Sequence, residues 1–282
     1  DEKMEELARQ RGTMAEFPWI PTFENLLKST SFVEDMSRCL RILRQAYEYE
    51  VDVEFAANFT PKFTACVNLL QCRPFHIRRD DSPISAPEVE ADDCVLAVRG
   101  SVIGHGRQLE LGRIIYVDPE AYSALVDRDR YRVARVVGDL TRSASSGPHR
   151  ATLLIGPGRW GTTTPSLGVP ASFATINQAA AICEITRMRE GLTPDASLGT
   201  HFFNELVETD ILYFALQPGK EGHRIDEGFF KAAPNRIARL APSAADLEGV
   251  IRAIEPDGAA LSLYADPVAQ VALVYRGKES RS

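Results

Sequence analysis

The chain has 282 residues, of which 44% are hydrophobic and 25% are charged, and its formal net charge at pH 7 is −7. This acidic balance argues against a dedicated nucleic-acid-binding protein, which normally displays a basic patch or stripe. No apolar run approaches the ~20 residues of a membrane-spanning helix, so we expect neither nucleic acid nor membrane as a partner.

The length is typical of about two domains. The first residues, from Asp1 to Glu6, are charged and do not start with methionine, so we expect a piece of a longer protein whose natural N-terminus lies upstream. Five cysteines without any CxxC spacing are typical of a protein from the reducing cytoplasm. Cys39, Cys66 and Cys183 stand within apolar patterns, which predicts that they are buried.

The first region has the pattern of a helix followed by two strands. Apolar residues recur at spacings of three and four between residues 30 and 48. Ser31 and Glu34 have the spacing of a capping box at the start of this helix. Two strands are expected at 51–57 and 65–72, separated by turn residues.

A domain boundary is expected at residues 79–93, which combine charge, two prolines and small residues with almost no apolar pattern. The predicted domains are therefore residues 1–78 and residues 94–282. The second domain alternates strand and helix signals, which is typical of an α/β or α+β layer architecture. Its expected strands are 95–98, 113–117, 151–155, 179–185, 211–216, 259–264 and 270–275. Its expected helices run from Asp118-Pro119 to about Arg142, with a break near 127–129, and over 200–208 and 244–254.

Polar side chains share faces on the two strands expected in the first domain. Side chains alternate along a strand with a period of two, so Asp52 and Glu54 lie on one face, as do Gln71 and Arg73. If these strands pair as a hairpin, an acid, an amide and a guanidinium converge on one polar surface. Carboxylates hold Mg²⁺ together with phosphate oxygens, and a guanidinium forks onto phosphate, so the set suits a nucleotide triphosphate. The alternative is an edge hairpin with a Glu–Arg pair on its surface.

The residues Asp52-Val53-Glu54-Phe55-Ala56 and Leu70-Gln71-Cys72-Arg73-Pro74 resemble the closing signature of an ATP-grasp domain. The family is that of phosphoenolpyruvate synthase and pyruvate phosphate dikinase, in which an Asp-(Ile/Val)-Glu strand precedes a strand ending in Gln-x-Arg. The resemblance implies that Glu54 and Gln71 serve a site for ATP and Mg²⁺, with Glu54 as the metal ligand. It also implies that Arg73 is catalytic and contacts the nucleotide phosphates.

Much of that family's machinery has no counterpart in the sequence. The resemblance to the nucleotide domain covers only about residues 20–78, and the family's lysine, arginine and adenine-binding elements would lie upstream. No Gly-Gly-x-Thr-(Ser/Cys)-His segment is present, so neither the phosphohistidine domain nor the phosphoenolpyruvate-binding barrel is expected. We therefore expect the fragment to be nearly inactive alone and to need the upstream ATP-grasp half of its own protein.

The segment Gly156-Pro157-Gly158-Arg159-Trp160-Gly161 follows an expected strand and fits GxGxxG literally. Pro165 and Pro170 come soon after it and oppose the continuous helix that a dinucleotide site needs, so we expect no such site. A Walker loop is not expected either, because no Lys-Ser/Thr pair follows. The alternatives are an anion-binding loop and a tight turn in which Trp160 packs into the core and Arg159 pairs with an acid.

An anion site at this loop would use Gly156, Gly158, Gly161 and Arg159, together with His201 of the segment GTHFF. A histidine followed by two phenylalanines is also typical of a partly buried, hydrogen-bonded residue. The other histidines are dispersed without ligand spacing, so we expect no metal site among them.

The sequences LLIGPGRWGTTTPSLGVP and SLGTHFFNEL, with a strand containing Glu184 between them, carry a second resemblance. They are similar to a region found after the nucleotide domain in a group of bacterial pyruvate- and phosphoenolpyruvate-binding-domain proteins. This resemblance covers residues 94–217 and implies an accessory α/β domain without an assigned chemistry.

Two functions of different classes are compatible with these patterns. The first is the C-terminal part of an ATP-dependent phosphotransferase of the phosphoenolpyruvate synthase type, with ATP and Mg²⁺ as cofactors and pyruvate or another small molecule as acceptor. The second is a non-catalytic regulatory module in which residues 94–282 bind an anionic metabolite or another protein. We favour the enzyme for the full-length protein.

Overall fold

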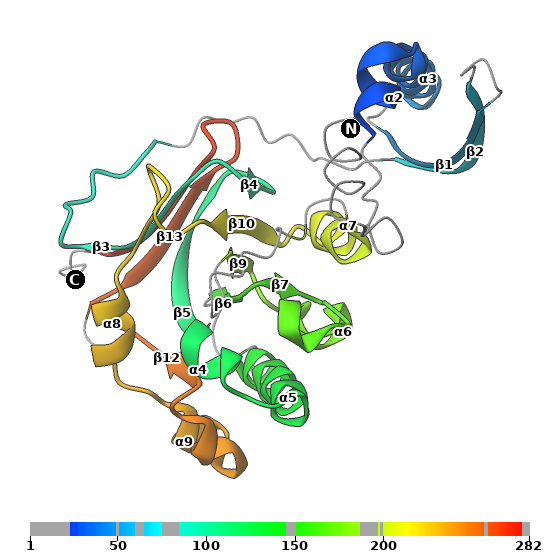
Figure 1. Ribbon diagram of the computed structural model, residues 1–282. Coiled ribbons are helices and arrows are strands. Elements are labelled where there is room, and N and C mark those ends of the chain that lie inside the picture. Colours follow the sequence, from blue (N-terminus) through cyan, green and yellow to red (C-terminus); the bar gives the residue numbers. More distant parts are fainter. Residues whose placement is uncertain are drawn as a thin grey trace, which may run out of the picture. The chain divides into compact units, whose positions relative to one another are not determined.

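The computed structural model describes residues 23–48, 51–59, 65–74, 85–144, 151–186, 197, 200–256 and 259–277. The chain divides into two compact units, Asp1–Phe75 and His76–Ser282, hereafter unit 1 and unit 2. Both units combine helices with strands, so the chain belongs to the mixed α/β class (Figure 1).

The described part of unit 1 holds helices α2 (Glu24–Ser29) and α3 (Phe32–Tyr47) and strands β1 (Val51–Phe59) and β2 (Ala65–Pro74). The expected helix and both expected strands are thus confirmed. The expected capping box at Ser31 does not form. The backbone of Ser31 has φ −74° and ψ 1° instead of the extended conformation of a capping residue, and its hydroxyl donates to Asp35 Oδ2 over 2.8 Å.

A small aromatic cluster joins α3 to the hairpin in unit 1. The Phe32 ring centroid lies 5.9 Å from that of Phe55 and 6.0 Å from that of Phe59. No described side chain of unit 1 is fully buried, and Leu70 is 66% exposed. One helix layer on a two-stranded hairpin closes no interior, and this accounts for the exposure.

The cysteines differ in burial between the two units. Cys183 in unit 2 is buried as expected, whereas in unit 1 Cys66 is exposed and Cys39 is only partly buried, so the full burial expected for these two is wrong. Cys66 lies on the thin hairpin, where apolar pattern does not lead to burial. Burial raises the pKa of the Cys94 and Cys183 thiols, and both therefore behave as small apolar groups.

Unit 2 is built on one curled sheet. Its described strands are β3 (Cys94–Arg99), β4 (Val102–Ile103), β5 (Arg107–Val117), β6 (Ala151–Pro157), β9 (Ala181–Ile185), β10 (Leu212–Leu216), β11 (Arg224–Ile225), β12 (Ile251–Ile254), β13 (Leu261–Asp266) and β14 (Val271–Arg276). They follow the order β11-β3-β14-β13-β5-β6-β9-β10-β4, and β12 pairs with the end of β5. Strands β5, β6, β9 and β10 are parallel, whereas β13 and β12 run antiparallel to β5. The parallel and antiparallel parts of the sheet therefore meet at β5.

The chain itself joins the two sides of this sheet. β4 ends the strand order and β3 lies near its other end, yet only Gly100 and Ser101 separate them, with φ of 87° and 55°. The Ala215 amide donates to the Ser101 carbonyl, and the Gly100 amide donates to the Gln270 carbonyl. The Gln270 side chain accepts from the Val102 amide over 3.1 Å and donates to the Val102 carbonyl over 2.8 Å. The sheet is thereby curled back on itself, like a small barrel.

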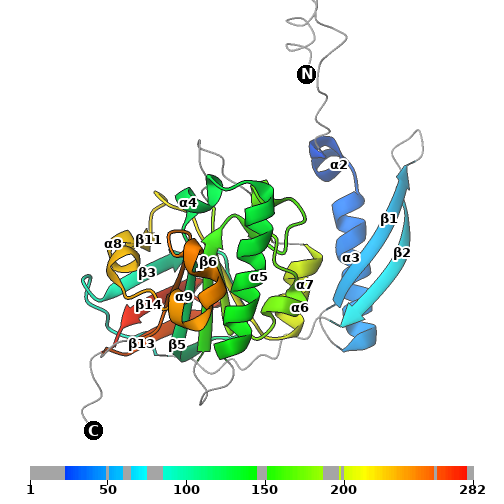
Figure 2. The same cartoon turned by 90° about the horizontal axis from the view of Figure 1, so that it is seen from below.

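Apolar side chains fill both sides of the curled sheet. Inside the curl, one buried cluster includes Leu96, Leu111, Leu153, Phe214 and Phe230. Outside, helices α5 (Asp127–Ala144), α6 (Phe173–Ile176) and α7 (His201–Glu208) lie side by side along the parallel strands (Figures 1 and 2) and form a second buried cluster with them. Shorter helices α4 (Pro119–Ser123), α8 (Glu227–Ala232) and α9 (Ile237–Leu240) lie in the connections.

The helix expected at 244–254 is wrong. A 3₁₀ helix, Pro242–Leu247, is followed by the strand β12, which pairs antiparallel with the end of β5. A short apolar segment has the same appearance whether it is a buried helix or a buried strand, and here pairing with β5 decides. The other expected strands and helices of unit 2 are present, including the helix start at Asp118.

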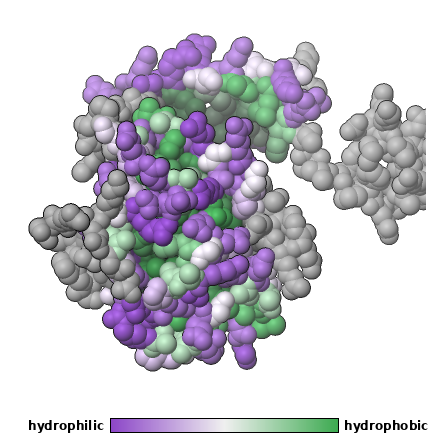
Figure 3. All heavy atoms as spheres, turned by 90° about the vertical axis from the view of Figure 1, so that its left-hand side faces the viewer, coloured by the Kyte–Doolittle hydropathy of each residue, from purple (hydrophilic) through white to green (hydrophobic). Residues whose placement is uncertain are grey.

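Within the described residues, no helix is both long and apolar enough to cross a membrane. On the face drawn in Figure 3, hydrophilic and hydrophobic residues are interspersed. Single apolar residues on a surface are normal and by themselves mark no binding site.

A charged cluster ties the start of β5 to the turn before β10. Asp210 has a positive φ of 60°, and its carboxylate pairs with His105 Nδ1 and with the Arg107 guanidinium. Arg107 also donates to the carbonyls of His105 and Asp210, each over 3.2 Å. Burial opposes ionisation of Asp210, but the His105 hydrogen bond and the Arg107 charge prevail and lower its pKa.

We expect Asp210→Asn to remove a pH-dependent contribution to stability. Because the folded-state pKa is lowered, the carboxylate stabilises the fold above its unfolded pKa of about 3.9, and this contribution disappears as the pH falls through the folded-state pKa. Half of the Asp210 side chain is exposed, so the loss at pH 7 should be only about 0.5–1 kcal/mol. Asparagine tolerates positive φ, so the substitution adds no backbone strain. Urea unfolding at several pH values measures this, and equal acid dependence in both proteins would contradict it.

Candidate functional site

The β1–β2 hairpin brings the predicted nucleotide-site residues opposite each other. The strands pair antiparallel, with Glu54 opposite Gln71 and Asp52 opposite Arg73. The register shifts directly after Glu54, as at a β-bulge. Bulges re-aim side chains and are over-represented next to active sites. The expected pairing of the strands is confirmed, while the side chain of Arg73 lies outside what the structure describes.

The hairpin has the donor chemistry of a site for Mg²⁺ with ATP. Across the described parts of the chain, no three His, Cys, Asp or Glu side chains gather closely enough to hold a metal by themselves. Mg²⁺ beside ATP needs only one or two carboxylates, because phosphate oxygens and water fill its remaining positions. Glu54 lies on the exposed hairpin surface and supplies such a carboxylate.

The glycines of the GPGRWG loop lie where a side chain has no room. A Cβ atom on Gly158 would stand 2.1 Å from the Leu167 carbonyl oxygen. A Cβ atom on Gly161 would stand 2.3 Å from the Phe202 ring, so this loop touches the GTHFF segment. Both glycines also have positive φ, 60° and 71°, which side chains other than glycine rarely adopt.

Trp160 anchors the same loop in the core of unit 2. It belongs to the short strand β7 (Arg159–Trp160), which pairs parallel with β8 (Gly168–Val169). Its indole is 1% exposed, lies against Gly156 and donates to the Cys183 carbonyl over 3.4 Å. The packing of Trp160 into the core, expected for a tight turn, is confirmed.

The loop amides and the two charged candidates differ in their surroundings. The amides of Gly158 and Gly161 donate to carbonyls of neighbouring strands, over 2.9 Å and 3.2 Å, so an anion here would depend on the half-buried Arg159. His201 is exposed at the start of α7, because Phe202 and Phe203 turn inward from the same turn. The expected partial burial of His201 is therefore wrong, and the anion site stays a prediction.

A buried carboxylate joins the glycine-rich loop to two other segments. Glu184 of β9 is 1% exposed. Its Oε1 accepts from the Trp160 amide over 2.9 Å and from the Ser197 hydroxyl over 2.5 Å. Its Oε2 accepts from the Ser197 amide over 2.8 Å and from the Tyr213 hydroxyl over 2.7 Å. Burial raises the pKa of Glu184, and the four hydrogen bonds oppose that rise.

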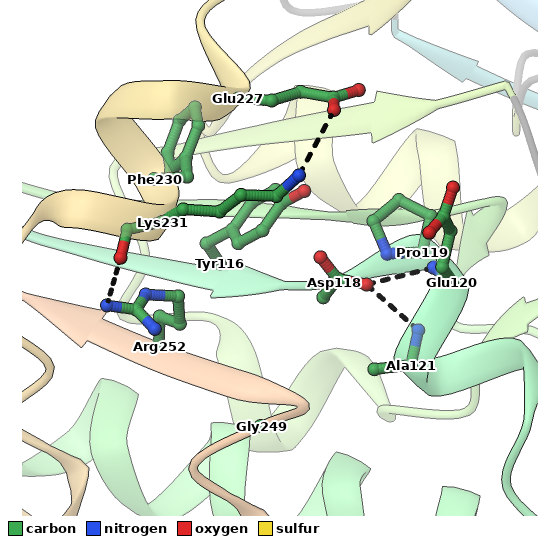
Figure 4. A pocket seen from close by; sticks show the side chains of 10 residues that line it. All are labelled: Tyr116, Asp118, Pro119, Glu120, Ala121, Glu227, Phe230, Lys231, Gly249 and Arg252. Carbon is green, nitrogen blue, oxygen red and sulfur yellow. Dashed lines mark hydrogen bonds and ion pairs between the residues drawn. The ribbon is translucent and has the colours of Figure 1, made fainter.

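A pocket of about 340 Å³ opens at the carboxyl end of β5 (Figure 4). Tyr116 lies one residue before the end of the strand, Asp118 and Glu120 line the side of α4, and Lys231 lines the side of α8. Arg252 reaches it from β12. Ligands of α/β proteins bind outside the carboxyl ends of parallel strands, where the connections diverge. The pocket lies at the carboxyl end of the strand where the parallel part of the sheet meets the antiparallel part, which makes it a candidate binding site.

Sequence reasoning found only one part of this pocket. Asp118 was singled out as a helix cap, and its Oδ1 accepts from the amides of Glu120 over 3.0 Å and Ala121 over 2.8 Å. Lys231 and Arg252 belong to α8 and β12, which lie far along the chain, and no local pattern connects them with Asp118. The sequence contains one sign that Glu184 is important, because it is the single acid inside an otherwise apolar strand.

A scan against protein-family models found no match, and neither did searches of curated proteins and of solved structures. The ATP-grasp resemblance therefore rests on the motif residues themselves. Two features of the molecule bear on function, the register of the hairpin in unit 1 and the pocket in unit 2.

Proposed function

We propose that unit 1 contributes the closing hairpin of an ATP-grasp site, and that the full-length protein is an ATP-dependent phosphotransferase of the phosphoenolpyruvate synthase type. The observation that carries this proposal is the β1–β2 register, with Glu54 opposite Gln71 and Asp52 opposite Arg73. Residues directly opposite in an antiparallel pair have side chains on one face, with Cβ atoms about 5 Å apart. This spacing is suited to groups that act together on one triphosphate.

Each of the three residues has a separate task in this proposal. Glu54 is a ligand of the Mg²⁺ that accompanies ATP, and Gln71 donates and accepts hydrogen bonds beside it. Arg73 forks its guanidinium onto the phosphates. The metal supplies neutralisation of phosphate charge. Phosphoryl transfer depends mainly on positioning and charge stabilisation, so these contacts account for the hairpin's share of the reaction. Pyruvate or another small molecule is the proposed acceptor.

Substitutions on the hairpin test this function in the full-length protein. Arg73→Ala is expected to lower ATP turnover by about 100-fold, the usual loss when one preorganised stabiliser of transition-state charge is removed. Glu54→Gln is expected to raise the Mg²⁺ concentration needed for half-maximal turnover. Consumption of ATP at varied Mg²⁺, with and without pyruvate, measures both effects.

Matched controls lie on the exposed surface of α3. Arg38→Ala and Glu34→Gln remove the same kinds of charge from unit 1 without touching the hairpin, so turnover should stay within about twofold of the parent protein. Circular dichroism checks that all variants fold alike. Unchanged ATP turnover in a folded Arg73→Ala protein would end the catalytic assignment.

A further inference from the structure

One side of the pocket at β5 offers a carboxylate oxygen without an internal partner. Asp118 caps α4 with Oδ1 alone, which accepts from the first amides of that helix. Its other oxygen has no hydrogen-bond partner in the described parts of the chain, and in Figure 4 it is directed into the space between α4 and α8. Glu120 lies beside it on the exposed rim. This side of the pocket is therefore suited to an ammonium group.

The side formed by α8 is cationic. The Lys231 ammonium lies 3.7 Å from Glu227 Oε2, and the side chains of this pair are 73% and 46% exposed. An exposed pair at this distance is weak, so Lys231 can exchange Glu227 for a ligand acid at little cost. Arg252 adds a second positive charge, held in place by hydrogen bonds to the carbonyls of Lys231 over 3.1 Å and Ala233 over 2.6 Å.

An aromatic surface lies between the two charged sides. Tyr116 and Phe230 are 5% and 1% exposed, and their rings stack with centroids 4.4 Å apart and an interplanar angle of 21°. Figure 4 shows Tyr116 between Asp118 and Lys231. These rings form a rigid, largely buried base between the two charged sides, and only an edge of Tyr116 reaches the pocket.

We propose that this pocket binds a small zwitterion, a molecule with a primary ammonium group and a carboxylate or phosphate group joined by a short carbon chain. The ammonium contacts Asp118, the acid contacts Lys231, and the carbon chain spans the pocket between them. A simple amine would bring no acid to Lys231 and Arg252, whose only carboxylate on that side of the pocket, among the residues described, is the weakly paired Glu227. A simple acid would face the carboxylates of Asp118 and Glu120. Only a ligand with both signs complements both sides, and unit 2 then acts as a metabolite-binding module independent of the ATP site.

The proposal is tested by titrating the 282-residue chain calorimetrically with size-matched probes. The zwitterions are the ω-amino acids from glycine to 6-aminohexanoate, with O-phosphoethanolamine as the phosphate form. The single-charge probes are butylamine and butyrate, which match 4-aminobutyrate in length. At least one zwitterion is expected to bind, and the two single-charge probes at least about tenfold more weakly, since each lacks one charge-assisted contact.

Two substitutions separate the charges from the fold. Asp118→Asn removes the charge but keeps the oxygen that caps α4, since asparagine is as good a cap as aspartate. Lys231→Met keeps most of the side-chain length without the ammonium. Each should weaken the best zwitterion about tenfold. Glu205→Gln and Lys220→Met change exposed charges outside the pocket and should leave binding unchanged.

Each possible result of these titrations either supports the proposal or overturns it. Binding of a zwitterion that both pocket variants weaken, and both control variants leave intact, supports the proposal. Butylamine or butyrate binding as tightly as 4-aminobutyrate would overturn it, because one charged side would then suffice. Absence of binding by every probe at about 10 mM would also overturn it, because a dissociation constant above that is a very weak affinity. So would Asp118→Asn and Lys231→Met proteins that bind the zwitterion as tightly as the parent.

Discussion

Glu184→Ala is expected to destabilise unit 2 by about 3–5 kcal/mol, more than any other single side-chain truncation proposed for this protein. The substitution removes the hydrogen-bond acceptor of two backbone amides and two hydroxyls that lie in the interior. A buried donor left without an acceptor costs about 1–3 kcal/mol, and the four costs do not add fully because the site relaxes. Urea unfolding of the parent and the variant, followed by circular dichroism, measures the difference.

Three further variants show whether the hydrogen bonds of Glu184 are the cause. Tyr213→Phe removes one of the four donors and should cost about 1 kcal/mol. Glu184→Gln keeps the volume of the side chain but places an amide nitrogen, which donates, against another donor, so an intermediate loss of stability is expected. This variant tests the role of the hydrogen bonds even if Glu184→Ala does not fold. Glu205→Ala removes an exposed acid from α7 and should cost at most about 0.5 kcal/mol. A Glu184→Ala protein as stable as Glu205→Ala would contradict the assigned role.

The position of Glu184 explains why one side chain matters so much. It belongs to β9, and its partners are the glycine-rich loop after β6, Ser197 and the neighbouring strand β10. Tyr213 remains a donor to it, because burial raises the pKa of the tyrosine hydroxyl. The carboxylate thus connects the segments that follow the adjacent parallel strands β6 and β9. These segments lie at the carboxyl ends of the parallel strands, as does the pocket at β5.

Local patterns predicted much of the secondary structure. The apolar spacing of α3, the Asp-Pro start of α4 and the two strands of the hairpin depend on neighbouring residues, and the structure confirms all three. Alternation along the two strands predicted the faces of Glu54 and Gln71, whereas the register shift after Glu54 was not predictable from the sequence. Their use in ATP chemistry rests on resemblance and is a proposal.

Features that depend on distant segments were not accessible in the same way. The closure of the sheet uses Gln270 against Val102, 168 positions apart, and no local spacing encodes that pair. The segment 244–254 has an apolar pattern that predicts a helix. Its pairing with β5, which makes part of it a strand, was not predictable because β5 lies far earlier in the chain. The pocket at β5 draws on α4, α8 and β12, so its charges come together only in the fold. The glycine motif was visible, but the contacts that require glycine were not.

Those contacts predict a graded series of Gly→Ala substitutions, in which Gly158→Ala is more damaging than Gly100→Ala or Gly249→Ala. Alanine at Gly158 must keep a φ of 60° and bring its Cβ to 2.1 Å from the backbone carbonyl of Leu167. The positive φ costs about 1–2 kcal/mol, and the overlap adds about 1–3 kcal/mol because a backbone atom, unlike a flexible side chain, has to move. We expect a total loss of about 2–5 kcal/mol in the free energy of unfolding, measured by urea titration.

Two other glycines separate strain from overlap. Gly100 has a φ of 87° with nothing within 4 Å of its Cβ position, so Gly100→Ala should lose only the about 1–2 kcal/mol of the backbone term. Gly249 has neither positive φ nor a close neighbour, and Gly249→Ala should be neutral or slightly stabilising because alanine restricts the unfolded chain. If Gly158→Ala proves no worse than Gly100→Ala, the loop can shift away from Leu167, and the GPGRWG glycines are then required for backbone conformation alone.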